Sequence, residues 1–205
     1  SFMKPVYIEH NTIMDTELVL LNRHIEHKLH LCTLFLFRFS RLIHIAVNDE
    51  LRNHLTNKKL NRVIYSQNGY HVPQYTLSDI DQDIIEKVLK FKQSYKKTGL
   101  FCGNGYAWHG CEDIIHLFKN QPDIGLIIVG PYTHFSHHDI IQISYANSAT
   151  IIQLIECVDF AISTFRWDMI GISEGSPLKS RQYLCHGCPV LVNYYDCAYD
   201  FKDLQ

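Results

Sequence analysis

The sequence has no excess of charge of either sign and little glycine or proline. Its 205 residues include 19 Lys and Arg against 21 Asp and Glu, which gives a formal net charge of -2. Such a balance creates no long-range field for a polyanion, so we expect no nucleic-acid partner. Ten glycines and six prolines exclude collagen-like and low-complexity chains. The 46% apolar content excludes a disordered chain.

Long apolar runs and a cysteine framework are also missing. The most apolar stretch, residues 29–37, is too short to span a bilayer, and no leader pattern opens the chain. The seven cysteines are scattered and odd in number, whereas a disulfide framework is typical of short secreted chains with an even count. We therefore expect reduced thiols and a cytoplasmic location.

Short β-rich runs alternate with longer amphipathic runs along the chain. The run at 124–129 is continuously apolar, as a parallel strand buried on both faces requires. This order predicts an α/β fold with a Rossmann-like, doubly wound parallel sheet. A polar segment at 71–78 predicts a linker, and Ser78 is expected to cap the next helix. The expected strands are 6–10, 42–47, 62–66, 100–102, 124–129, 140–143, 160–163 and 189–192, and the expected helices are 16–38, 49–56, 79–95, 112–118, 150–157 and 176–186.

One predicted helix, residues 16–38, combines basic residues with an apolar face. Leu18, Leu21, Ile25 and Leu29 follow helical spacing. Such a helix can touch an anionic membrane that carries a lipid acceptor, and peripheral membrane contact is one interpretation. Packing of the helix against its own sheet is the other, and it is the expectation here.

The loop from Gly103 to Gly110 is the first candidate binding site. It joins a strand to a helix, the connection at which α/β sheets bind ligands. Gly103 and Gly105 let backbone amides approach an anion, and the helix N-terminus favours negative charge. Trp108 stands where a G-x-G-x-x-G motif would have its third glycine, and no P-loop lysine follows. A tight turn without a ligand is the alternative interpretation.

A second strand-loop-helix connection lies around Ser176. Ser176 is expected to cap the helix, with Pro177 at its first position, so that free amides point into the loop. Lys179 adds a positive charge in the first turn of this predicted helix, and a phosphate is the natural ligand of such an arrangement. Glu174 and Gln182 flank the turn and can hold hydroxyl groups on either side of a diphosphate. The alternative is a capped helix with a solvated Lys and Glu.

Metal sites are not expected. Cys185 and Cys188 form one C-x-x-C pair without a second, whereas zinc needs four ligands. His134, His137 and His138 form a cluster in a polar loop that has no carboxylate motif. We therefore expect neither a metal nor a resident cofactor.

In their order along the chain, these motifs resemble the donor-binding domain of GT-B glycosyltransferases, in particular the retaining enzymes of family 4. That domain opens with a strand and a glycine loop, here Leu100–Gly103, and a Trp-His-Gly step, here Trp108–Gly110. It continues with a strand such as Leu126–Gly130. It ends with a Glu-x7-Glu element, here Glu174 to Gln182, and a Gly-x-Pro-Val strand, here Gly187–Val190.

The first half resembles the end of the other Rossmann-like domain of these enzymes. Ile45–Asn48, then Asn68-Gly69, resembles its last strand-helix-strand unit, and Lys4–His10 resembles a strand whose His faces the cleft. The resemblance implies the end of an acceptor-side domain (1–70), a linker with a connecting helix (71–96) and a nucleotide-sugar-binding domain (97–205). Complete enzymes of this kind have two full domains, so we expect a fragment or a truncated gene product.

The resemblance implies a hexosyltransferase-like enzyme. It would move a sugar from a nucleotide diphosphate sugar to an unknown sugar, lipid or protein acceptor, with retention and without an essential metal. Glu174, which orients sugar hydroxyls, and His10, across the cleft, would be the catalytic residues. Amides and cations would stabilise negative charge on the leaving diphosphate. The implied donor-binding residues are Gly103, Asn104, Gly105, His109, Ser176, Pro177, Leu178, Lys179 and Gln182, with Gln182 at the ribose.

Three residues depart from the family pattern. Gln182 replaces the second Glu, and Asn104 and His109 stand where Arg and Lys usually hold the diphosphate. We expect a protonated His109 to assist as a cation, so that donor binding weakens as pH rises through ~6.5. An inactive module that binds nucleotide sugars or partners is one alternative. A nicotinamide-dependent dehydrogenase is another, but its acidic residue, Asp123, precedes its strand instead of ending it.

Overall fold

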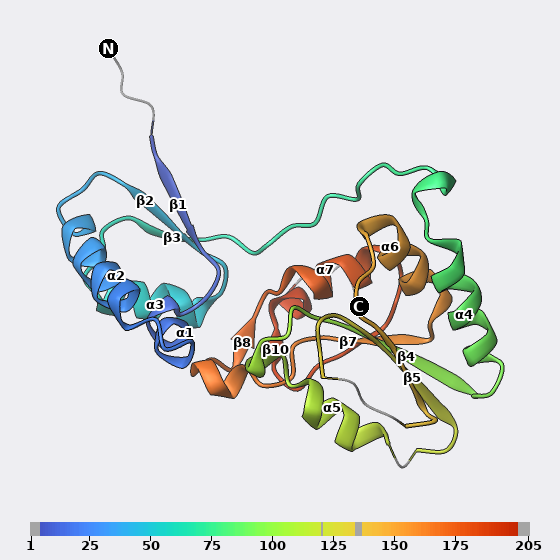
Figure 1. The fold of residues 1–205 in the computed structure, drawn as a ribbon. Coiled ribbons are helices and arrows are strands. Elements are labelled where there is room, and N and C mark those ends of the chain that lie inside the picture. Colours follow the sequence, from blue (N-terminus) through green and yellow to red (C-terminus); the bar gives the residue numbers. More distant parts are fainter. Residues whose placement is uncertain (1–4, 120, 134–136, 201–205) are drawn as a thin grey trace. The chain divides into compact units, whose positions relative to one another are not determined.

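The computed structural model describes residues 5–119, 121–133 and 137–200, which form two compact units (Figure 1). Unit 1 is drawn from residues 1–68, 167–176 and 194–205, and unit 2 from residues 69–166 and 177–193. The second half of the chain therefore returns to unit 1 twice. These units are groups of residues that pack together. They do not test the domain limits expected from the sequence, which stay a prediction.

Unit 1 is built on a three-stranded parallel sheet of order β1-β2-β3. Its strands are β1 (Tyr7–His10), β2 (Ile43–Ala46) and β3 (Val63–Tyr65), and its helices are α1 (Met14–Leu20), α2 (His24–Phe37) and α3 (Asp49–Asn57). The helices cover one face of this sheet (Figure 1). In keeping with this, the carboxylate of Asp15 on α1 pairs with the other two helices. Its Oδ1 lies 3.1 Å from Nε2 of His30 on α2, and its Oδ2 lies 2.7 Å from Nζ of Lys58, just after α3. The apolar core beneath the helices consists of Leu34, Ala46, Val47, Leu51, Leu55 and Leu60.

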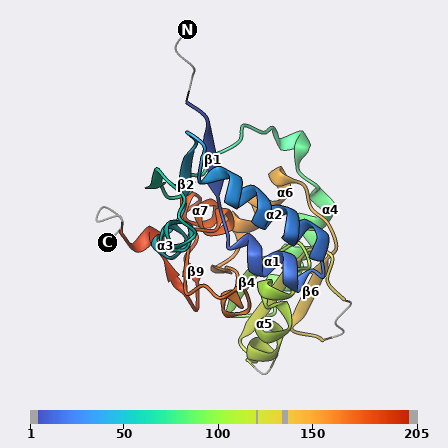
Figure 2. The ribbon, with the colours of Figure 1, turned by 90° about the vertical axis from the view of Figure 1, so that its left-hand side faces the viewer.

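The prediction of one helix over 16–38 is wrong, because the chain turns at Asn22. Asn22 has a left-handed φ of 56°, which asparagine tolerates and which commonly ends helices. The expected packing against the sheet is found for only part of the apolar face, since α2 contributes Leu34 to the core and fully buries no other residue. In Figure 2 α2 faces the viewer, and two of its apolar residues, Ile25 and Leu29, are 75% and 62% exposed. No helix in the described part of the chain is long and apolar enough to cross a membrane.

The returning segments add a small ladder to unit 1. β8 (Glu174–Gly175) pairs in parallel with β10 (Tyr195–Asp196), between the 3-10 turns η3 (Trp167–Ile170) and η4 (Cys197–Asp200). Strands of two residues are too short to show a hydrophobic period, which is why the sequence pattern does not predict them.

Unit 2 contains a five-stranded parallel sheet of order β6-β5-β4-β7-β9. Its strands are β4 (Lys97–Cys102), β5 (Ile124–Val129), β6 (Ile140–Ile143), β7 (Phe160–Ile162) and β9 (Val190–Leu191), and its helices are α4 (Gln82–Lys92), α5 (Cys111–Phe118), α6 (Ser148–Cys157) and α7 (Leu178–Cys185). From β4 the chain builds outward first on one side and then on the other, as in a doubly wound sheet. The predicted Rossmann-like α/β fold is confirmed.

Helices cover both faces of this sheet. Leu100 of β4 packs with Val88 of α4 and Leu154 of α6, whereas its neighbour Phe101 packs with Ile114 of α5. Figure 1 shows α5 on one side of the strands and α4 and α6 on the other. Adjacent side chains of a strand point to opposite faces, so burial on both sides explains the continuous apolar runs.

Two helix starts differ from the prediction. Asp81, not Ser78, caps α4 by accepting the Ile84 N–H at 3.2 Å, and a separate 3-10 turn, η1 (Leu77–Asp79), precedes it. α7 begins at Leu178 with Pro177 in the N-cap position, so Ser176 is not its cap. The first backbone N–H of this helix therefore belongs to Leu178.

Candidate functional site

The carboxyl end of β4 is the centre of the candidate site in unit 2. β5 and β7 flank β4, and the chain reaches them by connections that leave in opposite directions. Open α/β sheets bind ligands at such a switch point, just outside the carboxyl ends of the strands. The predicted loop 103–110 starts there, contains the 3-10 turn η2 (Ala107–His109) and leads into α5.

Lys179 brings the start of α7 to the same strand end. Its Nζ donates a hydrogen bond to the carbonyl oxygen of Cys102, the last residue of β4, at 2.9 Å. The Nζ atom also lies 5.2 Å from the centre of the Phe101 ring, close enough for a cation–π contact. Within unit 2, the fold thus brings the lysine of the second predicted turn to the strand end at which the first predicted loop begins.

Burial changes the charge of both basic side chains at this strand end. It lowers the pKa of Lys179 to about 8, so most of the ammonium groups keep their charge at neutral pH. Burial, together with the nearby charge of Lys179, lowers the pKa of His109 to about 3. The expectation of a protonated His109 is therefore wrong, and so is the predicted loss of binding through pH ~6.5. Lys179 supplies the positive charge here.

Gly103 makes room for a tyrosine that reaches across from β5. A Cβ atom on residue 103 would lie 1.9 Å from Tyr132 Oη and 2.7 Å from His109 Nδ1. The tyrosine hydroxyl itself lies 3.2 Å from His109 Nδ1. The sequence analysis missed Tyr132. Its position just beyond the carboxyl end of β5 could have identified it, because that end of the strand lies beside the end of β4.

The start of α7 provides free backbone donors. Pro177 has no N–H group, and the amides of Leu178 and Lys179 donate to no other residue in the described parts of the chain. Ser176 falls in unit 1, where its side chain is buried and its Oγ accepts the Asn68 N–H at 3.1 Å. Leu178 and Lys179 therefore offer the amides that an anion can reach at this helix end.

Gln182 lies one turn further along α7, where a tyrosine holds it. Its side chain is hydrogen-bonded to the hydroxyl group of Tyr70, whose ring lies 6.3 Å from that of His186. Burial raises the pKa of Tyr70, so the hydroxyl keeps its proton. Tyr70 is a second residue that the sequence analysis missed. It directly follows the predicted Asn68-Gly69 turn, which was its only signal.

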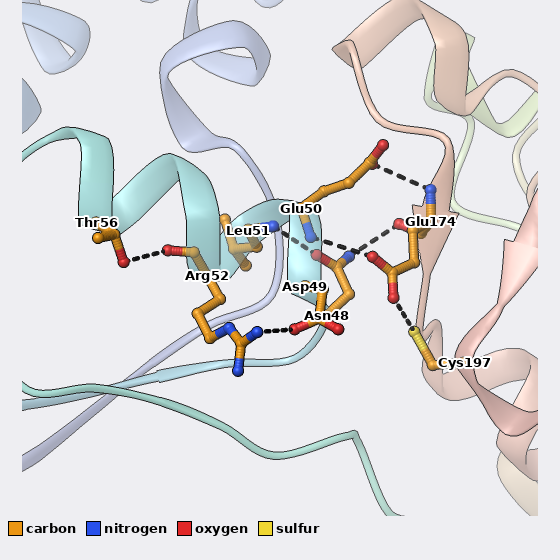
Figure 3. Close-up of polar contacts among 8 residues, drawn as sticks. All are labelled: Asn48, Asp49, Glu50, Leu51, Arg52, Thr56, Glu174 and Cys197. Atoms are coloured by element: carbon orange, nitrogen blue, oxygen red, sulfur yellow. Dashed lines mark hydrogen bonds and ion pairs between the residues drawn. The ribbon is translucent and has the colours of Figure 1, made fainter. Parts of the chain in front are cut away.

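Glu174 belongs to unit 1, where it joins the start of α3 (Figure 3). Its Oε2 accepts the Glu50 N–H at 3.1 Å, and its Oε1 lies 3.5 Å from Cys197 Sγ. In return, Glu50 Oε2 accepts the N–H groups of Ser173 at 2.7 Å and of Glu174 at 3.1 Å. Both carboxylates of this pair bind backbone amides. The geometry therefore gives Glu174 a structural role, and its catalytic role stays a prediction.

Asn48 joins the same two segments of unit 1. Its Oδ1 accepts the Leu51 N–H at 2.7 Å as the cap of α3, and its Nδ2 donates to the carbonyl oxygen of Glu174 at 2.8 Å (Figure 3). Because Asn48 is buried and loses both bonds, Asn48→Ala should lower the free energy of unfolding by about 2 kcal/mol. Chemical denaturation followed by Trp167 fluorescence, in a Trp108→Phe background, measures this change in unit 1.

Asn53→Ala is the matched control for this prediction. Asn53 lies on the same helix and is exposed, so its replacement should change the unfolding free energy by less than about 0.5 kcal/mol. If the two variants unfold at the same denaturant concentration, Asn48 does not hold the two segments together.

His10 ends β1 and meets a second histidine. Its Nε2 lies 3.0 Å from Nδ1 of His44, which is buried on β2. Burial, and then the charge of His44, lowers the pKa of His10 to about 4, so the ring is neutral near pH 7. The place of His10 across a donor cleft stays a prediction.

Comparison with known proteins finds this fold in solved structures. HepE of Anabaena in complex with UDP-glucose matches with a TM-score of 0.64 and 14% identity, over 96% of this chain and 55% of that one. HepE in complex with UDP and glucose matches with a TM-score of 0.63 and 15% identity over the same shares. The chain shares the fold of HepE. It spans about half the length of these neighbours. No family model and no curated protein matches the sequence.

A histidine cluster lies at the opposite edge of the same sheet. His137 Nδ1 and His138 Nε2 lie 3.5 Å and 3.0 Å from the carboxylate of Asp139, so three metal-ligating groups come together just before β6. Tyr95 Oη also donates to Asp139, at 3.0 Å. His134, the third histidine of the predicted cluster, lies outside the described residues. An ion held here would not touch a ligand at the carboxyl end of β4, because all five strands are parallel.

Proposed function

We propose that the chain is part of a GT-B-like glycosyltransferase that transfers a sugar from a nucleotide diphosphate sugar, with retention and without an essential metal. The observation that carries this proposal is the position of Lys179, whose ammonium group lies at the carboxyl end of β4 beside loop 103–110. The shared fold of HepE, whose structures hold UDP-glucose or UDP and glucose, supports a nucleotide sugar as the ligand.

The residues of unit 2 can stabilise a leaving diphosphate. Lys179 would neutralise negative charge as the bond between the sugar and the phosphate breaks, and the amides of Leu178 and Lys179 would donate to the same oxygens. Groups fixed in advance need no rearrangement when the charge develops. Gln182, next to Tyr70, would hydrogen-bond a ribose hydroxyl through its side-chain amide. The acceptor, the sugar and any membrane contact stay predictions.

Binding without catalysis is the second candidate function. Among the proposed donor-binding residues of unit 2, Asn104, His109 and Gln182 are all uncharged at neutral pH, which leaves Lys179 as the cation of the set. A site with one cation can hold a nucleotide sugar and still stabilise the departing diphosphate too weakly for turnover. The binding module and the enzyme would therefore take the same ligand, and only the enzyme would transfer the sugar.

Calorimetric titration with UDP-glucose, GDP-glucose, UDP and NADH tests the proposal. We expect saturable binding of a nucleotide diphosphate or its sugar, and none of NADH. Release of free nucleotide from the bound donor, measured with and without added sugars, separates an enzyme from a binding module. If none of a panel of nucleotide sugars binds, both forms of the proposal fail, and binding of NADH alone would indicate a dehydrogenase.

A further inference from the structure

The hydrogen bonds around His109 fix which ring nitrogen carries its proton. The backbone N–H of Asn104 donates to Nδ1 at 3.2 Å, and a backbone amide can only donate. Nδ1 must therefore present its lone pair. In a neutral imidazole the proton then resides on Nε2. A doubly protonated ring would point an N–H at the Asn104 amide, so the geometry and the low pKa of His109 agree.

The hydroxyl group of Tyr132 extends this chain of hydrogen bonds. Because Nδ1 accepts the Asn104 N–H, it cannot donate to the tyrosine oxygen, so the phenol proton of Tyr132 points to Nδ1 across 3.2 Å. Burial raises the pKa of Tyr132 far above its ordinary value, so this proton is retained. The bonds from Asn104 and from Tyr132 to His109 therefore each have one possible direction.

The fold holds Tyr132 in this position from two sides. Its ring packs 5.7 Å from that of Phe101, and its backbone oxygen accepts Gln142 Nε2 at 2.7 Å. Gly103 leaves the space that the hydroxyl occupies, since a Cβ atom there would lie 1.9 Å from Oη. A tyrosine held in this way acts as a rigid support for the imidazole.

The other nitrogen of His109 remains available for a ligand. Its Nε2 makes no hydrogen bond to another residue within the described parts of the chain. It is also not one of the side-chain atoms that those parts bury completely without a partner, so part of its surface reaches solvent although the residue as a whole is 9% exposed. Its neighbour Lys179 carries the charge, and a neutral donor beside it adds direction without repelling the ammonium group.

We propose that Tyr132 is a positioning residue that locks His109 as a neutral donor through Nε2–H, and that this N–H binds an oxygen of the nucleotide diphosphate sugar. The inference rests on the proposed function for its ligand, while the tautomer is a property of the free protein. Lys179 supplies charge and His109 supplies a directed hydrogen bond, which replaces the cation that the family pattern has at this position.

Long-range proton–nitrogen NMR spectra of protein labelled with 15N-histidine test the tautomer without any ligand. The His109 signals are assigned by their loss in a His109→Gln variant. We expect one neutral form, protonated at Nε2, that does not titrate between pH 5.5 and 8. In Tyr132→Phe we expect a second tautomer or a broadened signal, because one of the two donors to Nδ1 is gone. A wild-type His109 that is protonated at Nδ1, or that titrates in this range, would overturn the proposal.

UDP-glucose binding supplies the functional measurement. Tyr132→Phe should weaken binding about three- to tenfold, the effect of one neutral hydrogen bond held in place. Tyr95→Phe is the matched control, because it removes a phenol hydroxyl that is hydrogen-bonded to Asp139 at the opposite edge of the same sheet, and it should change affinity less than twofold. If the wild-type protein binds UDP-glucose and Tyr132→Phe binds it equally well, this inference fails alone. If the wild-type protein binds no nucleotide sugar, the proposed function fails.

Discussion

Lys179→Met should weaken UDP-glucose binding by about 10- to 100-fold, the effect of losing a charged hydrogen bond to a phosphate. Methionine keeps an unbranched stem of similar length over the Phe101 ring and removes the ammonium group. The carbonyl oxygen of Cys102 loses its donor at the same time. Calorimetry at fixed ionic strength measures the change, because phosphate contacts depend on salt.

Lys97→Met is the matched control. Lys97 begins β4 at the opposite end of the strand and pairs with Asp159 at 2.9 Å, with most of its side chain exposed. The control removes the same charge at the other end of the strand that Lys179 contacts, so the affinity of Lys97→Met should stay within about twofold of the wild type. A similar loss in both variants would point to the net charge of the protein. Unchanged binding in Lys179→Met would remove the observation on which the proposed function rests.

The pH dependence of binding gives a second measurement on the same lysine. The pKa of Lys179 is lowered to about 8, so the charged form that binds a diphosphate is present below that pH and is lost above it. UDP-glucose affinity should be constant from about pH 6 to 7.5 and then fall by up to about tenfold per pH unit. The diester phosphates of UDP-glucose do not titrate in this range. In Lys179→Met the fall above pH 8 should disappear.

Most of the fold could be predicted from the sequence, because long buried strands carry a strong signal. The apolar runs that became β4 and β5 are buried on both faces, and the alternation with helices then fixes a parallel sheet. The helix break at Asn22 could not be predicted from periodicity, since the apolar spacing continues through it. It depends on a single left-handed residue, which a hydrophobic pattern does not record.

The candidate site could be predicted in its position and only partly in its chemistry. The sequence places both predicted turns after strands of one parallel sheet, and the hydrogen bond from Lys179 Nζ to the carbonyl oxygen of Cys102 shows that the two segments meet at one strand end. The charge of His109 could not be predicted, because it depends on burial and on the position of Lys179. The roles of Tyr132 and Tyr70 depend on contacts between distant segments, for which a single sequence gives no signal.

Gly130→Ala should lower the free energy of unfolding of unit 2 by about 3 kcal/mol or more. Gly130 has a φ of 140°, which residues with a side chain rarely adopt, and a Cβ atom there would lie 2.0 Å from the carbonyl oxygen of Gly103. The clash is with backbone at the end of β4, so no side-chain rotation can relieve it. Chemical denaturation followed by Trp108 fluorescence, in a Trp167→Phe background, measures the stability of this unit.

Gly69→Ala separates this clash from the general effect of replacing glycine. A Cβ atom at residue 69 meets nothing within 4 Å, and its φ is not in the left-handed range. The free energy of unfolding of this variant should lie within about 1 kcal/mol of the wild-type value, with a slight gain in stability expected because alanine restricts the unfolded chain.

Gly130→Ala should also weaken UDP-glucose binding, since a shift of the Gly103 backbone moves the loop that holds His109. A Gly130→Ala protein as stable as Gly69→Ala would show that the ends of β4 and β5 are not packed this closely, and the support assigned to Tyr132 would then be lost as well.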